Sequence, residues 1–329
     1  MAKVVRQTAR QWIVTHEWMV NPMQQTEWIE GQGLLIWLAE VFSSLGTGLY
    51  IVSLFVSGLS QALAWWGALA GWIIVVGLKL PLHFLYLGRP WRFWRAMPPF
   101  TKAWRTSWIA RGTFFSVVYS GLGVCQLATS WLVWHGSPIV ALDILVKLLA
   151  GFFCLLTGIY CGFAMSYCKS LPFWNTGLLP IVITNAGIAD GLALLIGVGM
   201  IAGGVDTAPL ESVTRILLLA NVLLIFTYIL NGFYRSTTGW FSSRQLMTGR
   251  AAMPFWIATI LLGTVVPMGI SLQTLMGGGD AAAASSNTIL MIVAVAAHTC
   301  GAFGLKYCIL KVGYYEPILP KAKILGKHV

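Results

Sequence analysis

Charged side chains are scarce in this sequence. Only 9% of the 329 residues are Asp, Glu, Lys or Arg, whereas 57% are hydrophobic and the mean hydropathy is +0.77. A soluble domain usually carries about 25% charged residues, so this composition excludes a soluble enzyme and indicates a helical membrane protein. The apolar runs are long and lack a strict alternation of polar and apolar residues, which disfavours a transmembrane β-barrel.

Paired cysteines are absent. The six cysteines all lie within or beside apolar runs, and no two of them form a C-x-x-C motif. An iron–sulfur cluster or a zinc site within this chain is therefore not expected, and we interpret the cysteines as apolar packing residues. The sequence also has no Walker loop, nucleophile elbow or HExxH motif.

Histidine is rare as well, with five in the whole chain. A membrane cytochrome b with two haems needs four axial histidines within its spans, and only His83 and His298 lie clearly within apolar runs. That count excludes two haems. A single haem between these residues is disfavoured, because His83 is expected near the inner end of its span and His298 near the middle. We predict no haem and no metal site.

Eight apolar runs are each long enough to cross a bilayer, which takes about 20 residues. The fold class predicted is an all-α integral membrane protein with eight transmembrane helices in two four-helix bundles. The expected spans are residues 34–57, 62–87, 107–133, 140–165, 177–202, 211–233, 252–275 and 287–311. Around them we expect an interfacial arm at 1–33, a first bundle at 34–165, a linker at 166–176, a second bundle at 177–311 and a basic tail at 312–329.

Lys and Arg are missing from every second connection. The connections near residues 58–61, 134–139, 203–210 and 276–286 contain none. Positive charge near helix ends is retained in the cytoplasm, so the sequence predicts that both termini and the basic connections are cytoplasmic. The other connections and the two ends hold Lys3, Arg6, Arg10, Arg89, Arg92, Arg95, Lys102, Arg105, Lys169, Arg235, Arg244, Arg250, Lys321, Lys323 and Lys327.

The connection at residues 88–106 combines basic side chains with tryptophan and proline. Such a segment cannot span a membrane, and its Trp rings suit the lipid headgroup region. Ser107 is expected to cap the helix that follows. We predict that this connection docks a partner through Arg89, Arg92, Arg95, Lys102 and Arg105.

Several ionisable residues lie inside the expected spans, where each costs several kcal/mol unless it faces protein or water. Glu40 and Lys79 are expected at similar depth, so we predict that they pair, directly or through His83 or water. With Tyr86 and Arg111 these residues would form a polar cluster near the inner leaflet. Its donors and proton-exchanging groups suit a quinone head. The alternative is a buried ion pair that only fixes helix packing.

A second group lies nearer the outer side. Asp143 and Lys147 are four residues apart and are expected to satisfy each other. Asp190 and Arg215 are expected at comparable depth on adjacent spans, which predicts another pair. These four residues are candidates for a proton path, with purely structural pairing as the alternative. His298 is expected to be a hydrogen-bonded core histidine.

Four stretches resemble a known family. The sequences LGRPxRFW at 87–94 and TSWIxRG at 106–112 resemble the loop after the second span in the NrfD family, the membrane subunits of polysulfide-reductase-type complexes. The GxGLY run at 46–50 and the LPFWNT segment at 171–176 are similar to that family too. The opening WIEGQGLLIWLAE also resembles membrane subunits of phenylacetyl-CoA:acceptor oxidoreductases.

The resemblance implies a haem-free subunit that exchanges electrons with ubiquinone or menaquinone in a prokaryotic cytoplasmic membrane. It further implies an iron–sulfur partner subunit joined to a molybdenum or tungsten pterin catalytic subunit. In polysulfide-type complexes the catalytic subunits face the periplasm, whereas the charge pattern here predicts a cytoplasmic docking face. A secondary transporter and a purely structural membrane anchor are the competing interpretations, the former because of the four-plus-four layout and intramembrane charges.

Overall fold

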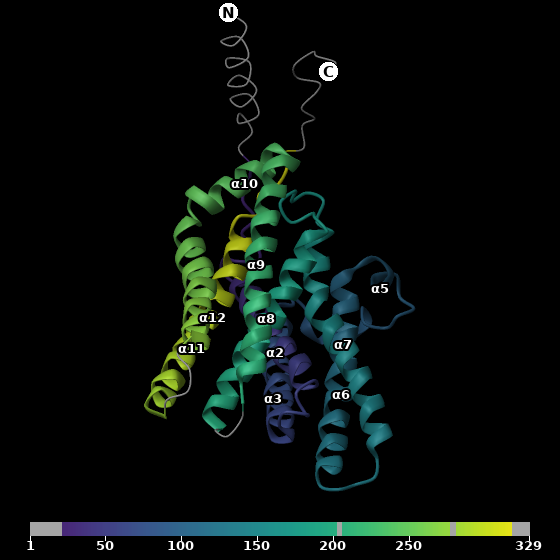
Figure 1. Cartoon of the computed structure of the whole chain (residues 1–329). Helices are drawn as coiled ribbons and strands as arrows, with labels where there is room; N and C mark the ends of the chain where they lie inside the picture. The colour runs from purple at the N-terminus through teal and green to yellow at the C-terminus, as the bar shows by residue number, and fades with distance from the viewer. Residues whose placement is uncertain (1–21, 203–205, 277–280, 318–329) are drawn as a thin grey trace, which may run out of the picture.

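The computed structural model describes residues 22–202, 206–276 and 281–317, with side chains omitted at 201–202 and 281–287 (Figure 1). The predicted basic residues at 3, 6 and 10 and at 321, 323 and 327 lie outside these ranges. Within them the chain is built from helices and loops, and eight helical segments are long and apolar enough to cross a membrane. The predicted eight-span membrane protein is therefore confirmed.

The spans follow the predicted runs to within a few residues. Single helices form six of them, and each of the remaining two is divided into consecutive segments. The single helices are α2 (Gly33–Ser53), α6 (Trp108–Trp134), α7 (Val140–Ser166), α8 (Leu178–Ala202), α9 (Ala208–Arg235) and α12 (Ala281–Lys311). The divided spans are α3 (Gln61–Ile73) with η1 (Ile74–Lys79) and α4 (Leu80–Tyr86), and η3 (Pro254–Val265) with α11 (Val266–Met276).

The centre of the molecule is the contact between α2 and α8, the first helices of the two halves (Figure 1). Glycines make this contact close: a side chain at Gly48 would overlap the carbonyl of Gly187, and one at Gly191 would overlap the backbone of Gly48. Small residues commonly allow membrane helices to approach in this way. The two halves thus share a tight interface.

The second span contains a π-helical turn, η1. Leu80 N donates to the carbonyl of Val75, five residues earlier. Pro81 follows and has no N–H to continue regular α-helical bonding, and such wide turns recur at functional positions in helices. Lys79 is the last residue of η1.

Three shorter helices lie in the connections: η2 (Pro90–Arg95), α5 (Lys102–Thr106) and α10 (Thr237–Thr248). Ser107 caps α6 as predicted, because its Oγ accepts from Ala110 N at 3.4 Å. The hydropathy pattern predicts only a connection where α10 lies. The Ser236 cap of this helix accepts from Gly239 N at 2.9 Å, and Ser243 Oγ donates to the carbonyl of Ile229 on α9 at 3.1 Å.

The described parts of the two terminal segments pair with each other. Gln24 and Tyr314 form an antiparallel bridge. The side-chain amides of Gln24 and Gln25 donate to the carbonyls of Lys311 and Leu310, both at 2.6 Å. These bonds satisfy carbonyl groups that the C-terminus of α12 leaves without intrahelical partners. Residues 22–32 and 312–317 therefore form one cap, which we call the terminal clasp.

Candidate functional site

Lys79 lies fully buried in the first half of the molecule, with 1% of its surface exposed. Its Nζ donates to Ser116 Oγ on α6 at 2.9 Å and lies 4.7 Å from the centre of the Tyr160 ring on α7. A buried ammonium group needs such partners to offset its lost hydration. The π-helical turn therefore places the Lys79 ammonium between Ser116 of α6 and the Tyr160 ring of α7.

His83 lies one helical turn after Lys79 and is partly exposed. Its Nε2 is 3.0 Å from Tyr160 Oη, and its Nδ1 is buried without a hydrogen-bond partner. A side chain at Gly112 would overlap the Tyr160 ring, so this glycine makes room for it. Lys79, His83 and Tyr160 form what we call the inner donor cluster. Sequence reasoning missed Tyr160, because it considered only residues with obvious charge in this span.

Glu40 is buried on α2 and shares a hydrogen bond with Cys161 on α7. The carboxyl oxygen Oε1 is buried and has no hydrogen-bond partner in the described structure. Lys79 is near enough to act on it electrostatically, yet no direct ion pair joins the two in the described structure, because Lys79 Nζ is directed to Ser116. The prediction that Glu40 and Lys79 form a direct ion pair is therefore wrong. A link between them through His83 or water stays a prediction.

The other two predicted members lie at the edge of this region. Tyr86 Oη donates to the carbonyl of Glu27 in the terminal clasp at 3.4 Å. Arg111 donates to the carbonyls of Trp104 and Arg105 at 3.0 and 2.7 Å, and its guanidinium lies 4.6 Å from the centre of the Trp108 ring. Arg111 thus holds the loop around α5 against α6, and these bonds direct its side chain away from the inner donor cluster.

The predicted docking residues are all solvent-exposed on η2, α5 and the loops around them. Arg89, Arg92, Arg95, Lys102 and Arg105 share this surface with three exposed aromatic rings, those of Trp91, Trp94 and Phe100. We call it the basic aromatic surface. Exposed aromatic and Arg side chains together are typical of protein interfaces and of membrane headgroup contacts.

Asp143 and Lys147 pair as predicted, with 2.7 Å between Lys147 Nζ and Asp143 Oδ2. The carboxylate also accepts from Ser130 Oγ at 2.6 Å, Ser130 accepts from Gln126 Nε2 at 2.9 Å, and Gln126 Oε1 accepts from Tyr50 Oη at 2.8 Å. These bonds form a continuous hydrogen-bonded chain into the bundle.

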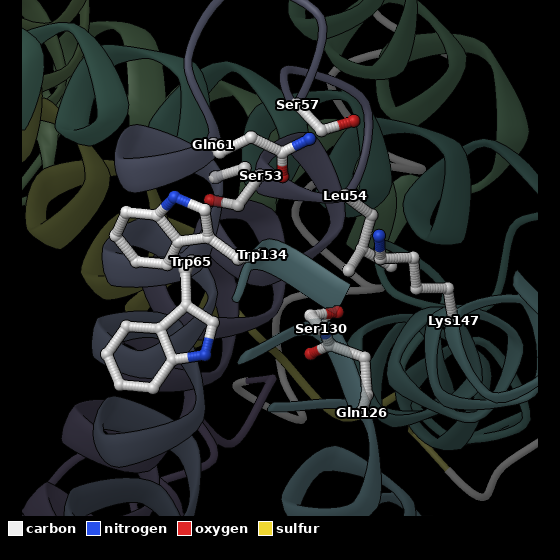
Figure 2. Close-up of a pocket in the computed structure, with 10 residues that line it drawn as sticks. Ser53, Leu54, Ser57, Gln61, Trp65, Gln126, Ser130, Trp134 and Lys147 are labelled. Carbon is white, nitrogen blue, oxygen red and sulfur yellow. Dashed lines mark hydrogen bonds between the residues drawn. The ribbon is translucent and has the colours of Figure 1, made fainter. Parts of the chain in front are cut away.

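Lys147, at the outer end of this chain, borders a small polar pocket (Figure 2). Gln126 and Ser130 lie together on one wall, with Lys147 to the side and Trp65 opposite. The pocket holds about 10 Å³ of space open to water, which is close to the minimum for one molecule. It admits water to the Asp143–Lys147 pair but has no room for a quinone ring.

The predicted pair between Asp190 and Arg215 is wrong. Asp190 faces α2 and α12, where its Oδ1 is 3.0 Å from His298 Nε2 and its Oδ2 accepts from Ser44 Oγ at 2.6 Å. Arg215 faces α11 and donates to Ser271 Oγ at 2.8 Å. Because α8 lies at the centre of the molecule, the Asp190 side chain meets helices from both halves rather than only its neighbour in sequence.

His298 is hydrogen-bonded in the core, as predicted, but it is also part of an acid–base pair. Its Nδ1 is 2.7 Å from the carbonyl of Gly263, so both ring nitrogens face oxygen atoms. Neutral imidazole has only one N–H. A protonated imidazole can therefore donate to Gly263 and form an ion pair with Asp190, although Nε2 makes no hydrogen bond in the described structure.

Sequence reasoning also missed Lys306. This residue lies on α12, two turns after His298, with 3% of its surface exposed and no hydrogen-bond partner for its Nζ. It is close enough to act electrostatically on Glu40, Asp190 and His298. The sequence did contain a signal for Lys306, because a lysine inside the eighth apolar run is expected to be buried in protein.

Comparison with known proteins identifies the family of this chain. Residues 33–317 match the model of the family described as "Polysulphide reductase, NrfD". The C subunit of polysulfide reductase from Wolinella succinogenes is 29% identical over 117 residues, which cover 34% of this chain and 37% of that protein. Protein NrfD of Escherichia coli K12 is 28% identical over 138 residues, 37% of this chain and 42% of that protein.

The aligned parts thus cover about two fifths of these curated relatives, whereas the family match runs from the start of α2 to the terminal clasp. That match includes all eight apolar helices. This multi-pass membrane protein belongs to the NrfD polysulphide reductase family, whose members are membrane subunits of redox enzyme complexes.

Proposed function

We propose that this chain is the haem-free, quinone-reactive membrane subunit of an oxidoreductase complex. It passes electrons between an iron–sulfur partner subunit and the membrane quinone pool. The observation that carries the proposal is the inner donor cluster: a buried ammonium, an imidazole and a phenol converge beside the basic aromatic surface of a chain in the NrfD family.

The chemistry of this cluster fits a quinone head. Quinone carbonyl oxygens accept hydrogen bonds, and Lys79, His83 and Tyr160 all carry donors. The His83 ring can present a donor or an acceptor to a ligand, depending on which nitrogen carries the proton. A bound ubiquinone or menaquinone supplies the capacity to carry two electrons and two protons. Lys79 holds positive charge near the carbonyl oxygens, and the His83–Tyr160 hydrogen bond moves protons to or from them.

The basic aromatic surface is proposed to bind the iron–sulfur subunit, which in turn joins a molybdenum or tungsten pterin catalytic subunit. The absence of Lys and Arg from alternate connections supports a position of this surface, and of both termini, in the cytoplasm of a prokaryote. The spans are proposed to form two four-helix bundles joined through α2 and α8. Arg111 supports the docking loop rather than touching quinone.

Protons are proposed to reach the site through the polar chains inside the membrane. One runs from Lys147 and Asp143 through Ser130 and Gln126 to Tyr50. The other contains the Asp190–His298 pair. Chains of hydrogen-bonded groups conduct protons between titratable side chains and enclosed water.

The test is the substitution His83→Ala in the complex isolated from membranes. Removal of the imidazole should lower quinone turnover about 100-fold, the scale of general acid–base catalysis, whereas reduction of a soluble dye by the catalytic partner should be unchanged. The matched control is His135→Ala. It removes an exposed histidine whose ring lies against Trp131, just after the C-terminal end of α6 and therefore at the end away from α5.

Unchanged quinone turnover in His83→Ala would refute the site. A quinone analogue that photo-crosslinks only to the iron–sulfur subunit would instead identify this chain as a structural anchor. Substrate uptake by the chain alone in liposomes would identify it as a transporter.

A further inference from the structure

Lys306 differs from the other buried lysine of the bundle. Lys79 has a hydroxyl acceptor and an aromatic ring against its ammonium. Lys306 is almost as deeply buried, but its Nζ has no hydrogen-bond partner. An ammonium with three unsatisfied N–H groups is costly in a low-dielectric interior, so this position needs an explanation.

The surroundings of Lys306 supply one. It acts electrostatically on Glu40 of α2 and on Asp190 of α8. The helices are linked at this level, because Ser44, one turn after Glu40, donates to Asp190, and His298, two turns before Lys306, faces the same carboxylate. Glu40 also has an unsatisfied atom, Oε1. Lysine has a flexible four-carbon stem, and ordered water commonly bridges such unsatisfied buried groups. Its ammonium can therefore serve either acid.

We propose that Lys306 links the protonation of Glu40 to that of the Asp190–His298 pair, by moving its positive charge toward whichever acid is ionised. It is a positioning residue that touches no quinone, and the inference rests on the proposed function of the inner donor cluster. The link crosses the interface between the two halves of the molecule, since Glu40 belongs to the first half and Asp190, His298 and Lys306 to the second.

The protons and charges balance in this exchange. At the start Glu40 and Asp190 are ionised, and Lys79, Lys306 and His298 are protonated. One proton then binds Glu40, which no longer needs a counter-charge. The Lys306 ammonium neutralises Asp190 instead, and His298 loses its Nε2 proton. One proton has entered at Glu40 and one has left His298, while the net charge of the buried group is unchanged.

A route for the departing proton adjoins His298. A cavity with about 30 Å³ of space open to water is lined by His298, Thr214, Ser271 and Glu211, with apolar side chains between them. Its volume suits one or two water molecules, although most of its wall is apolar and only these four side chains offer them hydrogen bonds. Glu211 lies in the first turn of α9, at the opposite end of this helix from Arg235. The cavity therefore leads from the Asp190–His298 pair toward the side whose connections hold no Lys or Arg, and Arg215 bonds Ser271 in its wall.

The test uses infrared difference spectroscopy on the intact chain in detergent, without quinone. The carboxyl stretching band of Glu40 is assigned by Glu40→Gln. In the otherwise native chain, Asp190→Asn should change the protonated fraction of Glu40 by about twofold or more, as expected of coupled neighbours. In a Lys306→Met background the same Asp190→Asn substitution should leave that fraction unchanged.

Lys311→Met is the matched control, because Lys311 lies on the same helix but pairs with Glu30 in the terminal clasp at 2.6 Å. In that background the effect of Asp190→Asn should persist. If the chain with Lys306→Met does not fold, Lys306→Gln replaces it as the background for the same comparison. An undiminished effect in a folded Lys306 variant would overturn the inference, as would the absence of any effect in the native chain.

A second measurement follows protons in the reconstituted complex. Lys306→Met should lower the number of protons moved across liposomes per quinone at least about twofold, while Lys311→Met should not. A native complex that turns over quinone without moving protons would overturn this inference but leave the proposed function standing. A native complex that fails to turn over quinone would refute the proposed function, and the infrared result would still decide the role of Lys306.

Discussion

The polar residues inside the bundle are bonded to very different extents. Asp190 has both carboxyl oxygens occupied, by His298 and Ser44, whereas Glu40 and Lys306 each keep an unsatisfied atom. Buried polar groups are nearly always bonded in stable interiors. The contacts of Asp190 therefore stabilise the packing of α8 against α2 and α12, while Glu40 and Lys306 each keep an atom that can bond water.

The Asp190–His298 pair can be tested by double-mutant cycles. The substitutions Asp190→Asn and His298→Gln should show a coupling free energy of about 0.5–3 kcal/mol, because the two side chains touch. Asp190→Asn with Arg215→Gln should show almost none, since Arg215 bonds Ser271 instead. The measurement is denaturant-induced unfolding in detergent micelles. Equal coupling in both cycles would contradict the placement of Asp190.

Sequence reasoning located the inner residues but could not assign their partners. Insertion cost marks Glu40, Lys79, Asp143 and Asp190 as buried in protein, and the spacing of four residues pairs Asp143 with Lys147 on one helix face. Partners on different helices depend on how each helix is rotated about its axis. That rotation is set by packing such as the glycine contacts of α8, and hydropathy does not report it.

At the scale of helices, hydropathy predicted the spans well because crossing a bilayer requires a long apolar run. It missed α10, whose average hydropathy is low. That helix is specified by local features: the Ser236 cap and the small buried residues Ser242 and Ser243 that pack on α9. It did not reveal the π-helical turn before Pro81 either, which needs the hydrogen-bond pattern to be seen.

The contact between α2 and α8 leads to a prediction about stability. Gly48→Ala places a methyl group against the carbonyl of Gly187, and it should lower the free energy of unfolding by about 1–3 kcal/mol, as overpacking does. Gly121→Ala on α6 is the matched control, because nothing lies within 4 Å of the added methyl group.

Alanine favours helix by about 1 kcal/mol over glycine, so the control should be neutral or stabilised. Unfolding in detergent micelles measures both variants. If Gly48→Ala were as stable as Gly121→Ala, the two halves could not be as closely packed as described.

At the scale of the whole molecule, the exposed basic side chains and the cavity beside His298 lie toward opposite ends. The basic aromatic surface and the terminal clasp belong to the end with Lys- and Arg-rich connections, and the cavity beside Glu211 leads to the other end. A subunit with this division can bind partners on one face and exchange protons with the other.

The orientation in the membrane is tested by labelling single introduced cysteines in intact cells with a membrane-impermeant maleimide. Phe55→Cys and Phe100→Cys are a matched pair, because these side chains are 82% and 86% exposed in connections at opposite ends. The charge pattern predicts that Phe55→Cys is labelled from outside and that Phe100→Cys reacts only after permeabilisation. The native chain, with its own cysteines, gives the background. The reverse pattern would place the basic surface outside the cell.

The terminal clasp has a consequence for biosynthesis. Its first half leaves the ribosome before the eight spans described above, and its second half is made after them. Trp37 likewise waits for Phe303, whose carbonyl accepts from the Trp37 indole N–H at 3.2 Å. The clasp can therefore close only after translation has passed residue 317 and all eight spans have been made. A partner that recognises the closed clasp would assemble with finished molecules and pass over truncated ones.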